Sequence, residues 1–310
     1  MISNVLQAVE DPKLNEGLSQ ISLLFIYGAM ALYTFAFLAF ATHLSRLASE
    51  KSADRASGAE KFGLLMLVIS AIAHGIGVVL RGISANRVPW ANMYEFSITG
   101  SFIVVAIYLL AIRLKDVRLI ATFISGFTLL ILGLATSIWY VQVKTLMPAL
   151  QSYWLVIHVM VAVLATAFFN IAAAFSIVYL LREAAWLKKA KGKLFAFARR
   201  VIDLFPTSDK LEKRAYRFNI IGFILWSFTL IAGAIWAERA WHRYWGWDTK
   251  EVWTFIIWTI YAGYLHANAT RGWTGKRSAW LALVGFAAII FNFTIVNLFF
   301  KGLHVYSGLK

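Results

Sequence analysis

The chain has 310 residues, of which 60% are apolar and only 15% are charged, and it carries a net charge of +15 with no cysteine. A soluble domain is about half apolar and about a quarter charged, so this composition argues strongly against a water-soluble fold. Without cysteine the chain forms no disulfide or thiolate metal site and relays no thiol redox equivalents by itself.

Several apolar stretches reach the length of about 20 residues that a helix needs to cross the hydrocarbon core. Because lipid cannot satisfy free backbone groups, such stretches predict a helix bundle. The N-terminus lacks the pattern of a removable signal peptide, so none is expected. The predicted fold is an all-α integral membrane protein, one domain over residues 1–310, with about eight transmembrane helices. The predicted spans are 21–43, 62–80, 93–112, 119–139, 152–181, 218–237, 252–269 and 278–300.

Basic residues divide the connections between these spans into two kinds. The loops at 44–61, 113–118, 182–217 and 270–277 contain 21 of the 30 Lys and Arg. Cytoplasmic loops carry such an excess, so these four loops are predicted to be cytoplasmic and both termini extracytoplasmic. This placement accounts for the basic composition, and no nucleic-acid partner is predicted.

The longest basic loop, 182–217, alternates basic and apolar residues. This pattern is typical of an amphipathic helix on the anionic inner leaflet of a membrane. A binding site for a partner protein is the alternative. The residues that form the pattern are Lys188, Lys189, Lys191, Lys193, Leu194, Phe195, Phe197, Arg199, Arg200 and Ile202.

The segment 236–258, WAERAWHRYWGWDTKEVWTFIIW, contains six of the thirteen tryptophans. An aromatic belt at the membrane interface spreads its tryptophans over many helix ends, whereas these are concentrated in one predicted outer connection. Charged residues, among them Arg239, Arg243 and Glu251, lie between them. Flat indole faces beside a few charges suit a large planar ligand with ionised edges. Haem, a quinone and a flavin all have that shape.

This segment resembles the WWD signature of haem-handling proteins in cytochrome c maturation. It is similar above all to the CcsA/ResC family of the system II pathway, with the pattern WAxxxWGxYWxWDPKExW. Two positions depart from it, because His242 replaces a usual Gly and Thr249 replaces a usual Pro. These departures leave open whether the bend of the connection is kept. The matching residues are Trp236, Trp241, Tyr244, Trp245, Trp247, Asp248, Lys250, Glu251 and Trp253.

Further similarities follow in the family's order over residues 74–306. They include Trp154 running into His158, Tyr264 to His266, and Asn297 followed by His304. Pro89 with Asn92, Met93, Tyr94 and Glu95 matches the start of the third span, although Phe96 replaces a common Ser.

The resemblance implies a haem-handling subunit of a holocytochrome c synthase. Such a subunit carries haem b to the outer side of the membrane and presents it for thioether attachment to a CxxCH apocytochrome c. The implied partners are a CcsB/ResB-like membrane protein and the apocytochrome. The implied location is the bacterial cytoplasmic membrane or a thylakoid membrane. No catalytic residue is expected, because the protein contributes chiefly by positioning haem.

Two of the six histidines, His158 and His304, lie at span ends on the predicted outer side. Imidazoles commonly hold haem iron, and the resemblance implies that these two are its axial ligands. The alternative is a pair of interfacial histidines bonded to solvent or lipid. The resemblance assigns His266, roughly 20 Å into its span, to a second haem position whose other ligand comes from the partner. The residues predicted to cradle the ring are Trp236, Trp241, Trp245, Trp247, Asp248 and Trp253.

Several polar residues keep open roles. His74 lies within the second span, where packing is its favoured role, and His242 is either a rim contact or solvated. Four outer arginines are candidates for the haem propionates, since Arg binds carboxylates through paired hydrogen bonds. Glu95 could instead complement the dipole of its own helix. The four arginines are Arg81, Arg87, Arg239 and Arg243.

Three rival functions fit part of the sequence. A system I CcmC-like haem-loading protein carries a WWD signature, but it is expected to have six spans and no insertion at 182–217. A bis-His b-type electron-transfer protein usually pairs histidines within its spans, whereas the best pair here lies at span ends. A transporter without a cofactor would place charges or broken helices at mid-membrane, and the predicted spans offer little of either.

Overall fold

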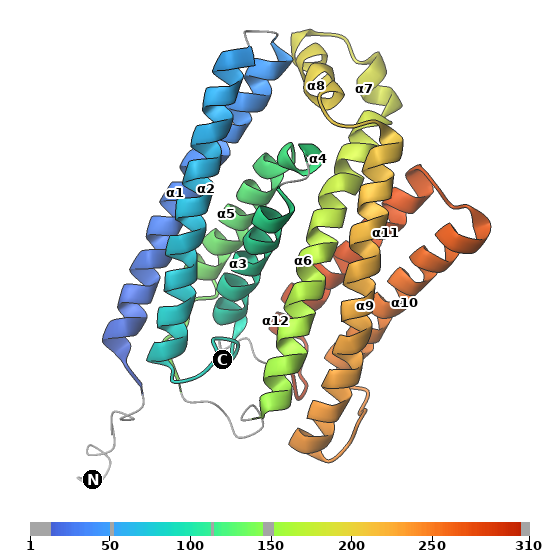
Figure 1. The fold of residues 1–310 in the computed structure, drawn as a ribbon. Coiled ribbons are helices and arrows are strands. Elements are labelled where there is room, and N and C mark those ends of the chain that lie inside the picture. Colours follow the sequence, from blue (N-terminus) through green and yellow to red (C-terminus); the bar gives the residue numbers. More distant parts are fainter. Residues whose placement is uncertain (1–13, 50–52, 113–114, 145–151, 305–310) are drawn as a thin grey trace.

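The computed structural model describes residues 14–49, 53–112, 115–144 and 152–304, and the regular elements in that part of the chain are helices. Helices α1 (Glu16–Ala48) and α2 (Ala53–Ser84) run side by side as an antiparallel pair (Figure 1). Helices α6 (Tyr153–Arg182) and α9 (Ser208–Trp241) form a second such pair.

The remaining helices complete the bundle around these two pairs. Helices α3 (Met93–Ala111) and α5 (Ala121–Ser137) lie between the pairs, joined through the short α4 (Lys115–Arg118) (Figure 1). Helices α10 (Thr249–Arg271) and α11 (Lys276–Phe291) form a hairpin beside the second pair. A π-helical turn, η2 (Asn292–Val296), and the short α12 (Asn297–Phe299) follow.

Six helical stretches are long and apolar enough to cross a membrane, so the chain is a multi-pass membrane protein. Helix α5 is apolar but has only 17 residues, and α10 is not among the six. The predicted membrane bundle is therefore confirmed. The count of eight spans and the outer position of both termini stay predictions. The six stretches are α1, residues 58–84 of α2, α3, α6, α9 and the run from Lys276 to Phe299.

Some helices extend well beyond the predicted spans. Helix α9 begins at Ser208, ten residues before the predicted span, because 208–217 contains no Gly or Pro that would end a helix. The predicted insertion at 182–217 therefore consists of the start of α9 together with α7 (Ala185–Lys189) and α8 (Lys193–Asp203). Helices α7 and α8 lie at the end of the bundle opposite the α9–α10 connection (Figure 1). Their contact with a membrane surface stays a prediction.

The buried apolar side chains form three clusters. The largest joins α1, α2, α3 and α5 to one face of α6, and a second joins α6, α9, α10 and α11. The third is small and lies near the start of α6 and the end of α9, where Leu155, Val159, Val163 and Trp236 pack together. This end cluster supports the predicted site.

Candidate functional site

The connection between α9 and α10 is much shorter than the tryptophan-rich segment, because most of 236–258 is helical. Helix α9 ends at Trp241, and His242 follows in the left-handed conformation with φ 57°. Its N–H donates to the carbonyl of Glu238 at 2.7 Å. Helices commonly end on such a residue, which is usually glycine. The helix therefore ends in a conformation that favours glycine, although His242 occupies this position.

Helix α10 begins with a capping box formed by Asp248 and Glu251. The Asp248 carboxylate accepts from the Lys250 N–H at 3.0 Å, and the Glu251 carboxylate accepts from the Asp248 N–H at 3.1 Å. Thr249 occupies the first helical position, where proline is favoured but not required. The capping box therefore starts the helix without the proline that the family usually has.

His158 lies near the start of α6 and is anchored through one ring nitrogen. Its Nδ1 lies 2.9 Å from the carbonyl oxygen of Thr229 on α9. A carbonyl only accepts, so Nδ1 carries the proton and Nε2 of the neutral ring keeps the lone pair. Gly233 gives the ring its space, because a Cβ there would lie 2.7 Å from His158 Cε1. The His158 side chain therefore presents Nε2 as a potential metal ligand.

His304 is anchored in the corresponding way by Asp248. Its Nδ1 lies 3.0 Å from Asp248 Oδ1, and the N–H of Leu303 donates to Asp248 Oδ2 at 2.8 Å. A Cβ on Gly302 would meet Asp248 Oδ2, so glycine permits the close approach of this segment. Because an ionised carboxylate only accepts hydrogen bonds, Nδ1 carries the proton, and in the neutral ring the lone pair lies on Nε2. Asp248 thus joins the start of α10 to the segment that carries His304.

The two histidines meet the same indole. The ring centroid of Trp236 lies 5.9 Å from that of His158, with the planes nearly parallel, and 5.4 Å from that of His304. Trp241 contacts both Trp236, at 4.8 Å, and His304, at 4.7 Å. Five of the predicted site residues are therefore brought together. They are His158, Trp236, Trp241, Asp248 and His304.

The other predicted site residues lie elsewhere. Trp245 and Trp247 contact each other, and Trp247 is 78% exposed. Trp253 packs against Phe291 at 4.4 Å, within the second apolar cluster. His266 is exposed on α10 and has no ring contact with the two outer histidines in the described structure. The six tryptophans of the segment thus divide into three kinds: Trp236 and Trp241 lie at the histidine pair, Trp245 and Trp247 are exposed, and Trp253 and Trp258 pack against the second apolar cluster.

The charges of the site favour an ionised Asp248. Burial alone would raise the pKa of its carboxyl, but the hydrogen bonds from His304, Lys250 and Leu303 lower it to about 2. Burial lowers the pKa of the Lys250 amine to about 8, although the Asp248 charge opposes this shift. The Lys250 amine donates to the side-chain oxygen of Asn297 and so holds α12 against the start of α10. In the described residues no cluster of three or more His, Asp or Glu forms a simple metal-ion site.

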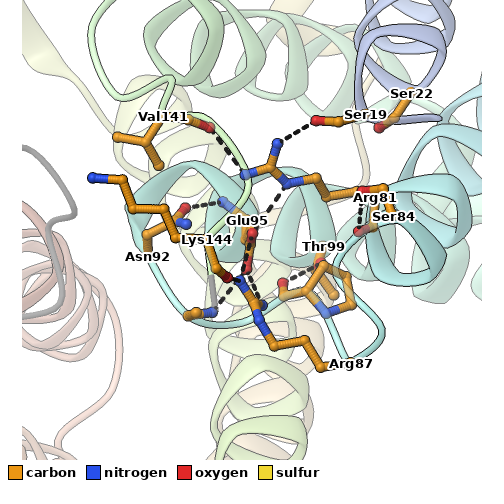
Figure 2. A network of polar contacts seen from close by, with 12 residues as sticks. Ser19, Ser22, Arg81, Ser84, Arg87, Asn92, Glu95, Thr99, Val141 and Lys144 are labelled. Atoms are coloured by element: carbon orange, nitrogen blue, oxygen red, sulfur yellow. Dashed lines mark hydrogen bonds and ion pairs between the residues drawn. The ribbon is translucent and has the colours of Figure 1, made fainter. Parts of the chain in front are cut away.

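Two of the four candidate arginines belong to a buried ion cluster with Glu95, named here the Glu95 clasp (Figure 2). Arg81 Nε donates to Glu95 Oε1 at 3.0 Å, and Arg87 donates to both carboxylate oxygens, at 2.6 and 3.1 Å. Arg81 also donates to Ser19 Oγ and to the carbonyl of Val141. The clasp therefore joins α1, α2, the α2–α3 connection, α3 and the segment after α5.

The clasp determines what its members can do. The Glu95 carboxylate is fully buried, and the Arg81 side chain is only 1% exposed. The guanidinium groups of Arg81 and Arg87 both bind this buried carboxylate. Glu95 does more than complement a helix dipole, since it also accepts from the Ala91 N–H at 2.9 Å. Of the remaining arginines, Arg243 donates to the Gly246 carbonyl, and Arg239 lies over the Tyr153 ring at 5.4 Å.

His74 lies in a separate place in the core. Its Nδ1 is 3.3 Å from the Tyr33 hydroxyl, and its ring contacts Phe102 edge-on. These neighbours belong to α1 and α3 and not to the end cluster, which agrees with the packing role favoured for His74.

Sequence reasoning missed the partners that orient the two histidines. Thr229 acts through its backbone carbonyl, which leaves no signal in the sequence. Gly233 and Gly302 are visible as glycines, but only their distances to His158 and Asp248 reveal why they are needed.

The model of the cytochrome C assembly protein family matches residues 90–304. This span covers more than half of the chain and includes His158, Trp236, Trp241, Asp248 and His304. The chain belongs to the cytochrome C assembly protein family. Its matched region begins at the α2–α3 connection and ends at His304.

Named relatives agree with this membership in the cytochrome C assembly family. The cytochrome c biogenesis protein CcsA of Prochlorococcus marinus is 35% identical over 262 residues, which are 78% of this chain and 83% of that protein. CcsA of Guillardia theta is 36% identical over 258 residues, 78% of this chain and 84% of that protein. CcsA of Chlamydomonas reinhardtii is 31% identical over 249 residues, 78% of this chain and 67% of that protein.

A solved structure has a similar fold. The cytochrome c heme lyase CcmF superposes with a TM-score of 0.66 at 14% identity, covering 89% of this chain and 46% of CcmF. At that identity the likeness concerns the fold alone. This member of the assembly family therefore shares the helical arrangement of a part of CcmF.

Proposed function

We propose that the chain is the haem-handling subunit of a system II cytochrome c synthase. The observation that carries this proposal is the pair of imidazoles, His158 and His304, each held through Nδ1 and each in contact with the Trp236 indole. Family membership and the CcsA relatives support the pathway. Haem b is the cargo of the protein and not a resident cofactor.

The donor set fits an iron porphyrin. Two imidazole nitrogens are the ligands that saturate the axial positions of haem iron. Ligating histidines typically donate their other N–H to a carbonyl or carboxylate, which fixes the tautomer and raises basicity. His158 does so with the Thr229 carbonyl and His304 with the Asp248 carboxylate. Trp236 and Trp241 supply the apolar surface for the ring.

The contribution of the protein to thioether formation is to position the haem. In thioether formation, the thiol of a CxxCH cysteine adds across a haem vinyl group. Sulfur bonds to one vinyl carbon and the proton to the other, without net oxidation. Because the chain has no cysteine, both thiols come from the apocytochrome. The residues His158 and His304 then hold the iron while the vinyl groups stay accessible to the substrate.

A second haem position at His266 needs a partner. His266 is exposed on α10, so a ligand from another membrane protein can approach it. A CcsB/ResB-like subunit is the proposed source of that ligand. The proposed location is the bacterial cytoplasmic membrane or a thylakoid membrane, with His158 and His304 on the extracytoplasmic side.

Coexpression with a CcsB-like partner and a CxxCH apocytochrome, in a host without its own maturation system, tests the proposal. We expect covalent haem on the cytochrome, detected by haem staining, and noncovalent haem in the purified membrane protein, detected as a pyridine haemochrome. Omitting the chain should abolish both signals. A correctly inserted chain that carries no haem and yields no holocytochrome would refute the proposed function.

Asp248→Asn is expected to weaken haem binding about 10- to 100-fold, which is the usual cost of losing an outer-sphere partner of a metal ligand. The amide keeps the size of the carboxylate but lacks the charge that holds the His304 Nδ1 proton. Spectrophotometric haem titration of the detergent-solubilised protein measures the effect. Asp209→Asn, in the first turn of α9, is the matched control. Equal affinities of the two variants would show that Asp248 does not support His304.

A further inference from the structure

Two buried indole N–H groups beside the histidine pair have no hydrogen-bond acceptor. The Nε1 atoms of Trp90 and Trp154 are inaccessible to solvent and have no partner in the described part of the chain. Two other indoles in the bundle are satisfied, since Trp226 donates to the Thr254 carbonyl at 3.1 Å and Trp258 to Ser227 Oγ at 2.9 Å. A buried donor without a partner is costly and calls for an explanation.

Both indoles belong to the end cluster that supports the site. Trp90 and Trp154 pack against the cluster of Leu155, Val159, Val163 and Trp236. Trp154 precedes His158 by four residues on α6, so the two side chains share one helix face about 6 Å apart along the axis. Trp154 is the nearer of the two to the helix start, towards the predicted outer surface.

The position of Trp90 is held by the Glu95 clasp. Trp90 lies in the α2–α3 connection directly before Ala91, whose N–H donates to Glu95 Oε2 at 2.9 Å. Arg87, three residues before Trp90, binds the same carboxylate. The clasp thus fixes the backbone on both sides of Trp90. The Trp90 indole is thereby held in the end cluster with Trp236.

We propose that the Nε1–H groups of Trp154 and Trp90 bind a propionate carboxylate of haem. The inference rests on the proposed function and names the recognition of the haem edge within that site. The four porphyrin nitrogens are occupied by iron, so the propionates are the acceptors that haem offers. Hydrogen bonds to an ionised acceptor are stronger than neutral ones. Arg81 and Arg87 bind the Glu95 carboxylate, and Arg87 Nε is a further buried donor without a partner in the described residues. Of these unpartnered donors, the two indoles are the ones that pack in the end cluster with Trp236.

Replacement of tryptophan by phenylalanine tests this, because it removes the N–H and keeps an aromatic ring. Binding of haem b and of its dimethyl ester, in which both carboxylates are blocked, should be titrated for wild type, Trp154→Phe and Trp90→Phe. We expect each variant to bind haem b about tenfold more weakly than wild type. We expect its affinity for the dimethyl ester to stay within about twofold of wild type.

Trp139→Phe is the matched control, because Trp139 is a buried tryptophan that packs on Phe293 and belongs to the largest cluster, not to the end cluster. It should leave both affinities unchanged. Equal losses for haem and for its ester in both indole variants would indicate packing and overturn the inference, as would unchanged haem affinity. If wild type binds both compounds and His158→Gly changes neither affinity, the proposed function itself fails, and the inference with it.

Discussion

Replacing His158 and His304 together by glycine is expected to reduce haem affinity about 100-fold or more, since loss of an outer-sphere partner alone costs 10- to 100-fold. Each side chain is held through Nδ1, and Nε2 is the ring nitrogen that we propose binds the iron. The double variant removes both axial donors, while Trp236 and Trp241 keep their places in the cluster. Haem content by pyridine haemochrome and the absorption spectrum of the purified protein measure the effect.

The single variants carry more specific information. His304→Gly should leave iron bound through His158 alone, with a spectrum changed from six-coordinate to five-coordinate, and added imidazole should restore the original spectrum. His242→Gly is the matched control, because His242 ends α9 and is exposed. It also restores the residue that favours the left-handed conformation found there. An unchanged haem content and spectrum in the double variant would eliminate both residues as ligands.

Glu95→Ala is expected to destabilise the folded protein by about 3–5 kcal/mol, the cost of leaving buried charges without their partner. Arg81 would lose its bond to the Glu95 carboxylate, and Arg87 would lose both of its paired hydrogen bonds. Because the clasp joins five segments at one end of the bundle, the loss should also loosen the α2–α3 connection that carries Trp90. Denaturation of the detergent-solubilised protein, followed by tryptophan fluorescence, measures the stability.

Glu60→Ala is the control for that measurement. Glu60 pairs with Arg118 at 3.5 Å, but the two side chains are 24% and 46% exposed. Exposed ion pairs contribute about 0–1 kcal/mol, so this variant should be nearly neutral. A Glu95→Ala variant that is as stable as Glu60→Ala would show that the buried cluster does not hold the loops together.

Much of the fold was predictable from local properties of the chain. Long apolar runs dictate membrane helices whatever their neighbours are, and charged loops mark the connections between them. The apolar pattern was less informative about helix ends. Helix α9 starts ten residues before its predicted span because a helix continues through polar residues until something breaks it. The lower apolarity of α10 similarly leaves its crossing of the membrane a prediction.

The histidines and tryptophans of the candidate site were predictable from the sequence, but the groups that orient the two histidines were not. His158, His304 and Trp236 stood out because histidine at a span end and clustered tryptophan are unusual and chemically specific. Trp245, Trp247 and Trp253 carried the same signal, yet the structure places them away from the pair. Residue type shows what a side chain can bind, whereas the direction in which it points depends on the turn between α9 and α10.

By itself, the sequence determined that the chain is a membrane protein of helices and that its chemistry rests on imidazole and indole groups. Those properties follow from residue type and spacing along the chain. Only the tertiary structure decided that Asp248 orients His304, 56 residues further on, and that Glu95 engages Arg81 and Arg87. Such pairings depend on which helix ends meet in space. The hydrophobic periodicity of one helix does not show which helix ends lie close together, because the packing of the whole bundle determines their proximity.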